Sequence, residues 1–134
     1  MEISRREFLT ATAALVAIGP TAWRANHNAP HDALTMYGLI GKMTAVPGQR
    51  DALVAILIDG VANMPGCLSY IIATDPADAD AIWITEVWDS QASHQASLGL
   101  PSVKNAIAKG RPLIAGFGSR TVTMPIGGQG LLNR

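Results

Sequence analysis

Two proline-glycine pairs, Pro47-Gly48 and Pro65-Gly66, divide the middle of the chain and most constrain its fold. Both pairs interrupt regular structure, because proline lacks a backbone donor and glycine favours turns. Residues 34–46, before the first pair, are rich in apolar groups and predict a strand that is buried on both faces for much of its length. Residues 49–64, between the pairs, repeat apolar residues at helical spacing and predict a helix with one buried stripe.

Two further strands are predicted over residues 67–75 and 81–89. The sequence PADAD between them favours a turn that joins neighbouring antiparallel strands. Alternation along the later strand places Ile82, Ile84, Glu86 and Trp88 on one face. Asp89 or Ser90 can cap a short helix over residues 90–98, because either side-chain oxygen accepts from a free N–H of the first turn.

The last third of the chain predicts another helix and a fourth strand. Pro101 suits a helix start, and Pro112 is expected to end or kink that helix near Gly110. After glycines 116 and 118, residues 119–126 alternate as a strand does. Residues 127–134 form a glycine-rich tail that we expect to be flexible or to be an arm for a partner.

This order of elements is that of the ferredoxin-like split βαβ class, an α+β fold. It predicts one domain over residues 35–126, with a four-stranded antiparallel sheet and helices on one face. The other face of the sheet would be largely apolar and uncovered, which monomers rarely tolerate. Pairing two such faces across a two-fold axis predicts a homodimer.

The first 25 residues resemble a twin-arginine export signal. Arg5 and Arg6 precede Phe8-Leu9 and an alanine-rich apolar run that is too short to span a bilayer. This resemblance implies export of a folded protein by the twin-arginine machinery to a periplasmic or extracellular location. Cleavage between residues 22 and 34, or none, stays open, and residues 26–34 are expected to be a linker. His27 and His31 with Asp32 are either solvated polar residues or a weak metal site.

Charge and cysteine content exclude two classes of function. Lysine plus arginine equal aspartate plus glutamate at 10 each, and no basic run occurs, so a nucleic-acid partner is not expected. The single cysteine, Cys67, excludes an intramolecular disulfide and a cysteine-based zinc site. Cys67 is expected to be a small buried residue, with a reactive thiol as the alternative.

The stretch EVWDSQASHQASLGLPSV, residues 86–103, resembles the antibiotic biosynthesis monooxygenase family, including its quinol monooxygenases. VPGQRDAL and MPGCLSY support the resemblance, which extends over residues 36–125. It implies a dimeric α+β barrel with a pocket between the sheet and the helices of each subunit. It also implies oxygenation of quinol-like or polycyclic aromatic substrates by O2 without a metal or other cofactor. The glycines of GFGSR and IGGQG form no phosphate-binding loop.

Carried over residue by residue, this resemblance locates a pocket better than a mechanism. Trp88 matches the family's pocket-lining tryptophan, and His94 stands where aromatic-polyketide members have a proton-relaying tyrosine. Ile84 replaces an asparagine, and Ser97 replaces a histidine found in many relatives. The haem-degrading branch relies on Asn, Trp and His at positions held here by Gly41, Ser97 and Ile107, so haem degradation is disfavoured.

Each candidate residue has a functional and a structural interpretation. His94 is an acid–base group or a helix-packing histidine, and Trp88 stacks a substrate or fills the core. Glu86 lines the cavity or pairs with Arg111 or a backbone donor, and Tyr70 donates into the pocket or belongs to the core or an interface. The expected catalytic residues are His94 and Trp88, and the expected substrate-binding residues are Tyr70, Glu86, Ile84 and Ser97. The alternative function is a non-catalytic module for small-ligand binding or stress response.

Overall fold

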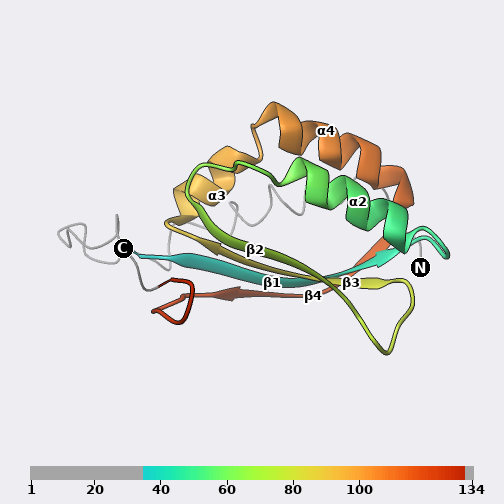
Figure 1. The fold of residues 1–134 in the computed structure, drawn as a ribbon, viewed down its shortest axis with the longest axis horizontal. Helices are drawn as coiled ribbons and strands as arrows, with labels where there is room; N and C mark the ends of the chain where they lie inside the picture. The colour runs from blue at the N-terminus through green and yellow to red at the C-terminus, as the bar shows by residue number, and fades with distance from the viewer. Residues whose placement is uncertain (1–34, 132–134) are drawn as a thin grey trace, which may run out of the picture. The chain divides into compact units, whose positions relative to one another are not determined.

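The computed structural model describes residues 35–131, so the predicted export signal, the linker with His27 and His31, and the end of the tail lie outside the described residues. The predicted order of elements is confirmed (Figure 1). The elements are β1 (Tyr37–Ala45), α2 (Arg50–Gly60), β2 (Cys67–Thr74), β3 (Ala81–Trp88), α3 (Gln91–Ser97), α4 (Pro101–Gly110), the 3-10 helix η2 (Arg111–Leu113) and β4 (Ile114–Thr123).

The four strands form one antiparallel sheet in the order β2-β3-β1-β4. Helices α2, α3 and α4 all lie on the same side of the sheet, with α2 and α4 packed together and α3 over the end where β3 finishes (Figure 1). This arrangement confirms the predicted ferredoxin-like α+β fold.

The core lies between the sheet and α2. Leu53 of α2 is fully buried against Ala45 of β1 and against Ile82 and Ile84 of β3. Burial of such aliphatic side chains contributes about 1.5–3 kcal/mol each. These β3 residues belong to the face predicted from strand alternation, so the prediction of that face is confirmed.

Two element boundaries differ from the prediction by four residues or more. β4 begins at Ile114 rather than residue 119, because glycines 116 and 118 lie within the strand, where its pairing with β1 shifts register at a bulge. The helix α2 ends at Gly60, four residues early, although Met64 beyond it is still buried. Most of β1 is buried or half-buried, although Ile40 on the helix-free face is 39% exposed.

Local chemistry explains where α3 begins. The Ser90 hydroxyl accepts a hydrogen bond from the Ser93 backbone N–H, so Ser90 rather than Asp89 is the cap. Gly66 has a φ of +80°, and a Cβ there would overlap the side chain of Ser93. Only glycine therefore allows the loop before β2 to approach α3 this closely.

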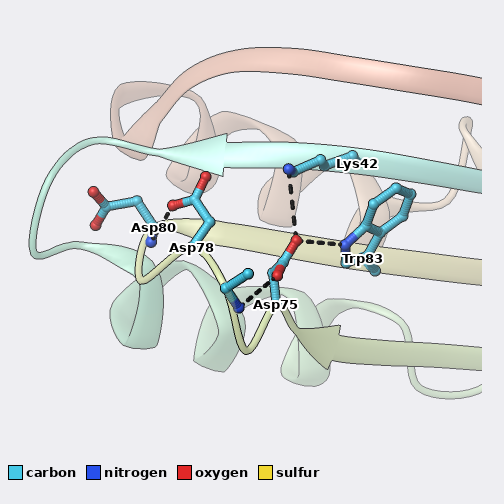
Figure 2. A network of polar contacts seen from close by, with 6 residues as sticks. Lys42, Asp75, Asp78, Asp80 and Trp83 are labelled. Carbon is cyan, nitrogen blue, oxygen red and sulfur yellow. Dashed lines mark hydrogen bonds and ion pairs between the residues drawn. The ribbon is translucent and has the colours of Figure 1, made fainter.

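The helix-free face of the sheet carries a polar network beside the hairpin that joins β2 and β3 (Figure 2). Asp75 accepts a hydrogen bond from Trp83 Nε1 at 2.9 Å and forms an ion pair with Lys42 Nζ at 3.5 Å. The hydrogen bond from Trp83 lowers the pKa of Asp75, and the backbone N–H of Ala77 and the charge of Lys42 act in the same direction. Trp83 therefore has a structural role on the face opposite Trp88.

None of the helices among residues 35–131 has the length and apolar character of a transmembrane span.

Candidate active site

Three side chains meet where β3 ends and α3 begins. Trp88 is 1% exposed, and its Nε1 donates a hydrogen bond to Glu86 Oε2 at 2.8 Å. The His94 ring lies edge-on to Trp88, with ring centroids 5.4 Å apart. His94 Nε2 lies 3.7 Å from the same Glu86 Oε2. Glu86 therefore connects the tryptophan of the strand with the histidine of the helix.

Two tyrosines complete this group, which we call the His94 cluster (Tyr37, Tyr70, Glu86, Trp88 and His94). Tyr37 of β1 pairs with Trp88, and its ring centroid lies 5.2 Å from that of His94. Tyr70 of β2 pairs with Glu86. Sequence reasoning identified four members and missed Tyr37, because only the register between β1 and β3 brings that residue beside Trp88.

Burial favours the uncharged forms of the two central titratable groups. It raises the pKa of Glu86 above its usual range, while the hydrogen bond from Trp88 and the positive charge of Arg120 lower it in part. Burial also lowers the pKa of His94, and the charge of Arg120 lowers it further. A fully charged ion pair would shift both pKa values in the opposite directions. The 3.7 Å contact is therefore one in which a neutral imidazole faces the carboxyl group.

The partner of Glu86 differs from the two alternatives considered from the sequence. Its donor is the Trp88 indole from the same strand face, not a backbone N–H. The arginine whose charge affects the pKa of Glu86 is Arg120 of β4, not Arg111. Strand order explains this outcome, because β4 lies next to β1 and only one strand separates it from β3.

Tyr70 and Cys67 flank Glu86 from β2 as protonated groups. Burial raises the pKa of Tyr70 far above its usual range, and the negative charges of Glu86 and Cys67 raise it further. Burial and Glu86 likewise raise the pKa of Cys67, whose thiol donates to the Ser69 carbonyl at 3.6 Å. A raised thiol pKa opposes nucleophilic reactivity, which favours the structural interpretation of Cys67.

Ile84 and Ser97, the other expected substrate-binding residues, are engaged within the protein. Ile84 is 8% exposed and belongs to the core around Leu53. Ser97 is 4% exposed, and its hydroxyl donates to the His94 carbonyl at 2.6 Å. Ser97 thus holds the backbone of His94 in place and adds no polar group next to Glu86.

Residues 35–131 offer no metal site but contain a groove away from the His94 cluster. No group of three or more His, Cys, Asp or Glu side chains is arranged there to hold a metal ion. A shallow groove of about 230 Å³ lies between α2 and α4, and its lining, which includes Ile56, Gly60 and Ala106, contains no member of the His94 cluster.

The His94 cluster has the elements of a proton-transfer site. A neutral imidazole accepts a proton, and the Glu86 carboxyl group lies 3.7 Å from the imidazole nitrogen. The rings of Tyr37 and Trp88 pack against His94 and give it an apolar environment.

Comparisons with known proteins give a consistent result. The model of the antibiotic biosynthesis monooxygenase family matches residues 36–109, which include the whole His94 cluster. A solved structure from Chloroflexus aurantiacus J-10-fl, described as a candidate antibiotic biosynthesis monooxygenase, is 68% identical, with a TM-score of 0.71. The match covers 72% of this chain and 98% of that chain.

More distant solved structures share the fold alone. A protein from Pseudomonas aeruginosa is 22% identical with a TM-score of 0.62, and the match covers 71% of this chain and 98% of that one. A candidate antibiotic biosynthesis monooxygenase from Caulobacter crescentus CB15 is 19% identical with a TM-score of 0.60, over 78% of this chain and 100% of that one. No curated protein matches the chain.

Proposed function

Because this chain belongs to the antibiotic biosynthesis monooxygenase family, we propose that it oxidises quinol-like or polycyclic aromatic compounds with O2 and without a cofactor. The observation that carries the proposal is the buried, neutral His94 beside Glu86 and Trp88. Such a histidine can remove a proton from a hydroxylated aromatic compound, and a group of this kind contributes about a hundredfold or more in rate.

The chemistry needs little from the protein beyond binding and proton transfer. Removal of a proton from the substrate by His94 leaves an electron-rich anion, which can itself transfer an electron to O2. In the complete reaction one oxygen atom enters the substrate, the other leaves as water, and all four electrons come from the substrate. Burial raises the pKa of Tyr70 far above its usual range, so Tyr70 does not act as the base.

The proposal is tested by oxygen consumption with a reduced naphthoquinol or an anthrone. We expect His94→Ala to lower kcat by about a hundredfold, because it removes the base. Trp88→Phe should lower activity less, since it keeps an aromatic wall but removes the hydrogen bond to Glu86. The control is Gln95→Ala, an exposed neighbour on the same helix. Wild-type turnover no faster than spontaneous oxidation across a substrate panel would exclude the enzyme.

Two observations favour a second function, that of a non-catalytic module that binds a small lipophilic ligand. Trp88 is almost completely buried, and the Ser97 hydroxyl donates its hydrogen bond to a backbone carbonyl. Saturable quenching of tryptophan fluorescence by such ligands, without oxygen consumption, would support this alternative.

We also propose that the protein is exported by the twin-arginine route to a periplasmic or extracellular location. Arg5 and Arg6 with the apolar run after them support this proposal. Replacing both by lysine should retain the full-length protein in the cytoplasm, as measured by cell fractionation. Unchanged export of this variant would remove the twin-arginine assignment.

A further inference from the structure

The register of the sheet brings Arg120 of β4 onto the row of Ile84, two residues before Glu86, although Arg120 is far from the His94 cluster in sequence and follows the residues that the family model matches. Gly41 of β1 pairs with Ile84 of β3 on one side and with Arg120 of β4 on the other. Residues directly opposite each other in an antiparallel sheet project to the same face. Ile84 is buried beneath the helices, so the side chain of Arg120 also projects from the helix-covered face of the sheet.

Gly41 leaves this part of the sheet open. A Cβ atom at Gly41 would have no other heavy atom within 4 Å, apart from its chain neighbours. The sheet therefore has a space between Ile84 and Arg120 that a larger residue at Gly41 would fill. This open space lies on the row of Ile84, two residues before Glu86 in β3.

The charge of Arg120 is available to such a ligand. Arg120 is exposed, and the ion pairs found within residues 35–131 do not include it. Its positive charge lowers the pKa values of both Glu86 and His94, in keeping with the register that sets Arg120 on the row of Ile84. Glu86 already accepts from Trp88, so Arg120 contributes positive charge to the edge of the site without being neutralised in an ion pair.

We propose that Arg120 and the space above Gly41 form an anion-binding subsite that holds the ionised oxygen of a hydroxylated aromatic ligand. The guanidinium group donates charge-assisted hydrogen bonds to this oxygen, while the aromatic ring of the ligand lies toward the His94 cluster. The subsite therefore stabilises the anion that forms when the bound ligand loses its proton. This inference rests on the proposed function for the class of ligand, but it concerns binding and is measured without turnover.

The first test compares 2-naphthol with 2-methoxynaphthalene, which cannot ionise, in the absence of oxygen. Binding is followed by tryptophan fluorescence, and ionisation of the bound naphthol by its absorbance. We expect the wild-type protein to lower the pKa of bound 2-naphthol relative to the free compound. Arg120→Gln should abolish this shift and weaken naphthol binding about tenfold, with no change for 2-methoxynaphthalene. The matched control is Lys104→Gln, which removes a positive charge from an exposed position on α4.

A second variant tests the space while keeping the charge. Gly41→Leu suits a strand and should fold, as checked by its thermal transition, but its side chain occupies the space beside Arg120. We expect it to weaken binding of both naphthalenes. Unchanged naphthol binding in either Arg120→Gln or Gly41→Leu, or no binding to the wild-type protein, would overturn the subsite.

The outcomes separate this inference from the proposed function. A protein that binds the naphtholate through Arg120 but consumes no oxygen with any substrate retains the subsite and loses the enzymatic activity. A protein that consumes oxygen, but whose binding and KM do not change in Arg120→Gln, retains the activity and loses the subsite.

Discussion

At the scale of single residues, the position of His94 determines its chemistry. Its ring lies against Tyr37 and Trp88, and Glu86 and the charge of Arg120 act on it from β3 and β4. Burial and Arg120 lower its pKa, so the native protein holds fewer protons at this group than the unfolded chain does near pH 6.5. The histidine is thereby kept in the basic form that proton abstraction requires.

This shift predicts how stability depends on pH. The contribution of a group with a lowered folded pKa is present above its usual pKa of 6.5 and is lost as pH falls toward the folded value. Well above pH 6.5, His94→Gln should reduce the free energy of unfolding by about 1 kcal/mol through lost packing. The difference in free energy of unfolding between the protein that keeps His94 and the His94→Gln variant should shrink as pH falls below 6.5. Only the former has a histidine at this position that can be protonated.

The measurement uses urea unfolding across pH in a Glu86→Gln background. Glu86 has a raised pKa, so its contribution is present below the usual value of 4.5 and is lost as pH rises, opposite to that of His94. If the difference in free energy of unfolding caused by His94→Gln stays constant with pH, the assignment of a lowered pKa to His94 is contradicted.

At the scale of elements, α2 and α4 approach closely because both carry small residues where they meet. A Cβ at Gly60 of α2 would overlap that of Ala106 on α4, and both residues are buried. The packing of these two helices sets where α4 lies above the sheet.

The contact predicts a compensating pair of substitutions. Gly60→Ala improves helix propensity but creates the overlap, so we expect a net loss of about 1–2 kcal/mol in the free energy of unfolding. Adding Ala106→Gly should recover part of that loss, because it removes the overlapping methyl group. A double-mutant cycle measured by chemical denaturation tests this coupling, with Ala62→Gly, at an exposed position just after α2, as the uncoupled partner. Additive losses for Gly60→Ala and Ala106→Gly would disprove the contact.

At the scale of the whole molecule, the helix-free face of the sheet supports our proposal of a homodimer. Ile40 of β1 and Ile71 of β2 project from this face and are 39% and 54% exposed. Both pair with Thr85 of β3, so they form one continuous row across three strands. Apolar surface of this kind is typical of an interface, and a second copy of the same face is complementary to it under two-fold symmetry.

The dimer is tested by placing a charge in this row. We expect Ile71→Asp to weaken self-association about tenfold or more, measured by sedimentation equilibrium, because an unpaired carboxylate would be buried at the interface. Ile58→Asp is a matched control, since Ile58 on α2 is 59% exposed on the opposite side of the sheet. A wild-type protein that sediments as a monomer, or equal effects of the two variants, would contradict this interface.

Sequence patterns determined the order and type of the elements, because local periodicity and turn residues act over a few residues. The alternation in β3 correctly placed Ile82, Ile84 and Trp88 on the buried face, and Pro101 and Gly110 marked the ends of α4. The start of β4 could not be read in this way. Glycines 116 and 118 resemble a loop in sequence, and only their pairing with β1 makes them part of a strand.

Only the tertiary structure decided which side chains surround His94. Strand order and register brought Tyr37, Tyr70 and Arg120 toward Glu86 from three other strands. The spacing of these residues along the sequence does not predict that they lie near one another. Burial then determined the charge of each group, since a pKa depends on the surrounding dielectric and on neighbouring charges rather than on residue type alone. Residue types and local elements therefore follow from the sequence, whereas the contacts and charge states of the candidate site arise from long-range packing.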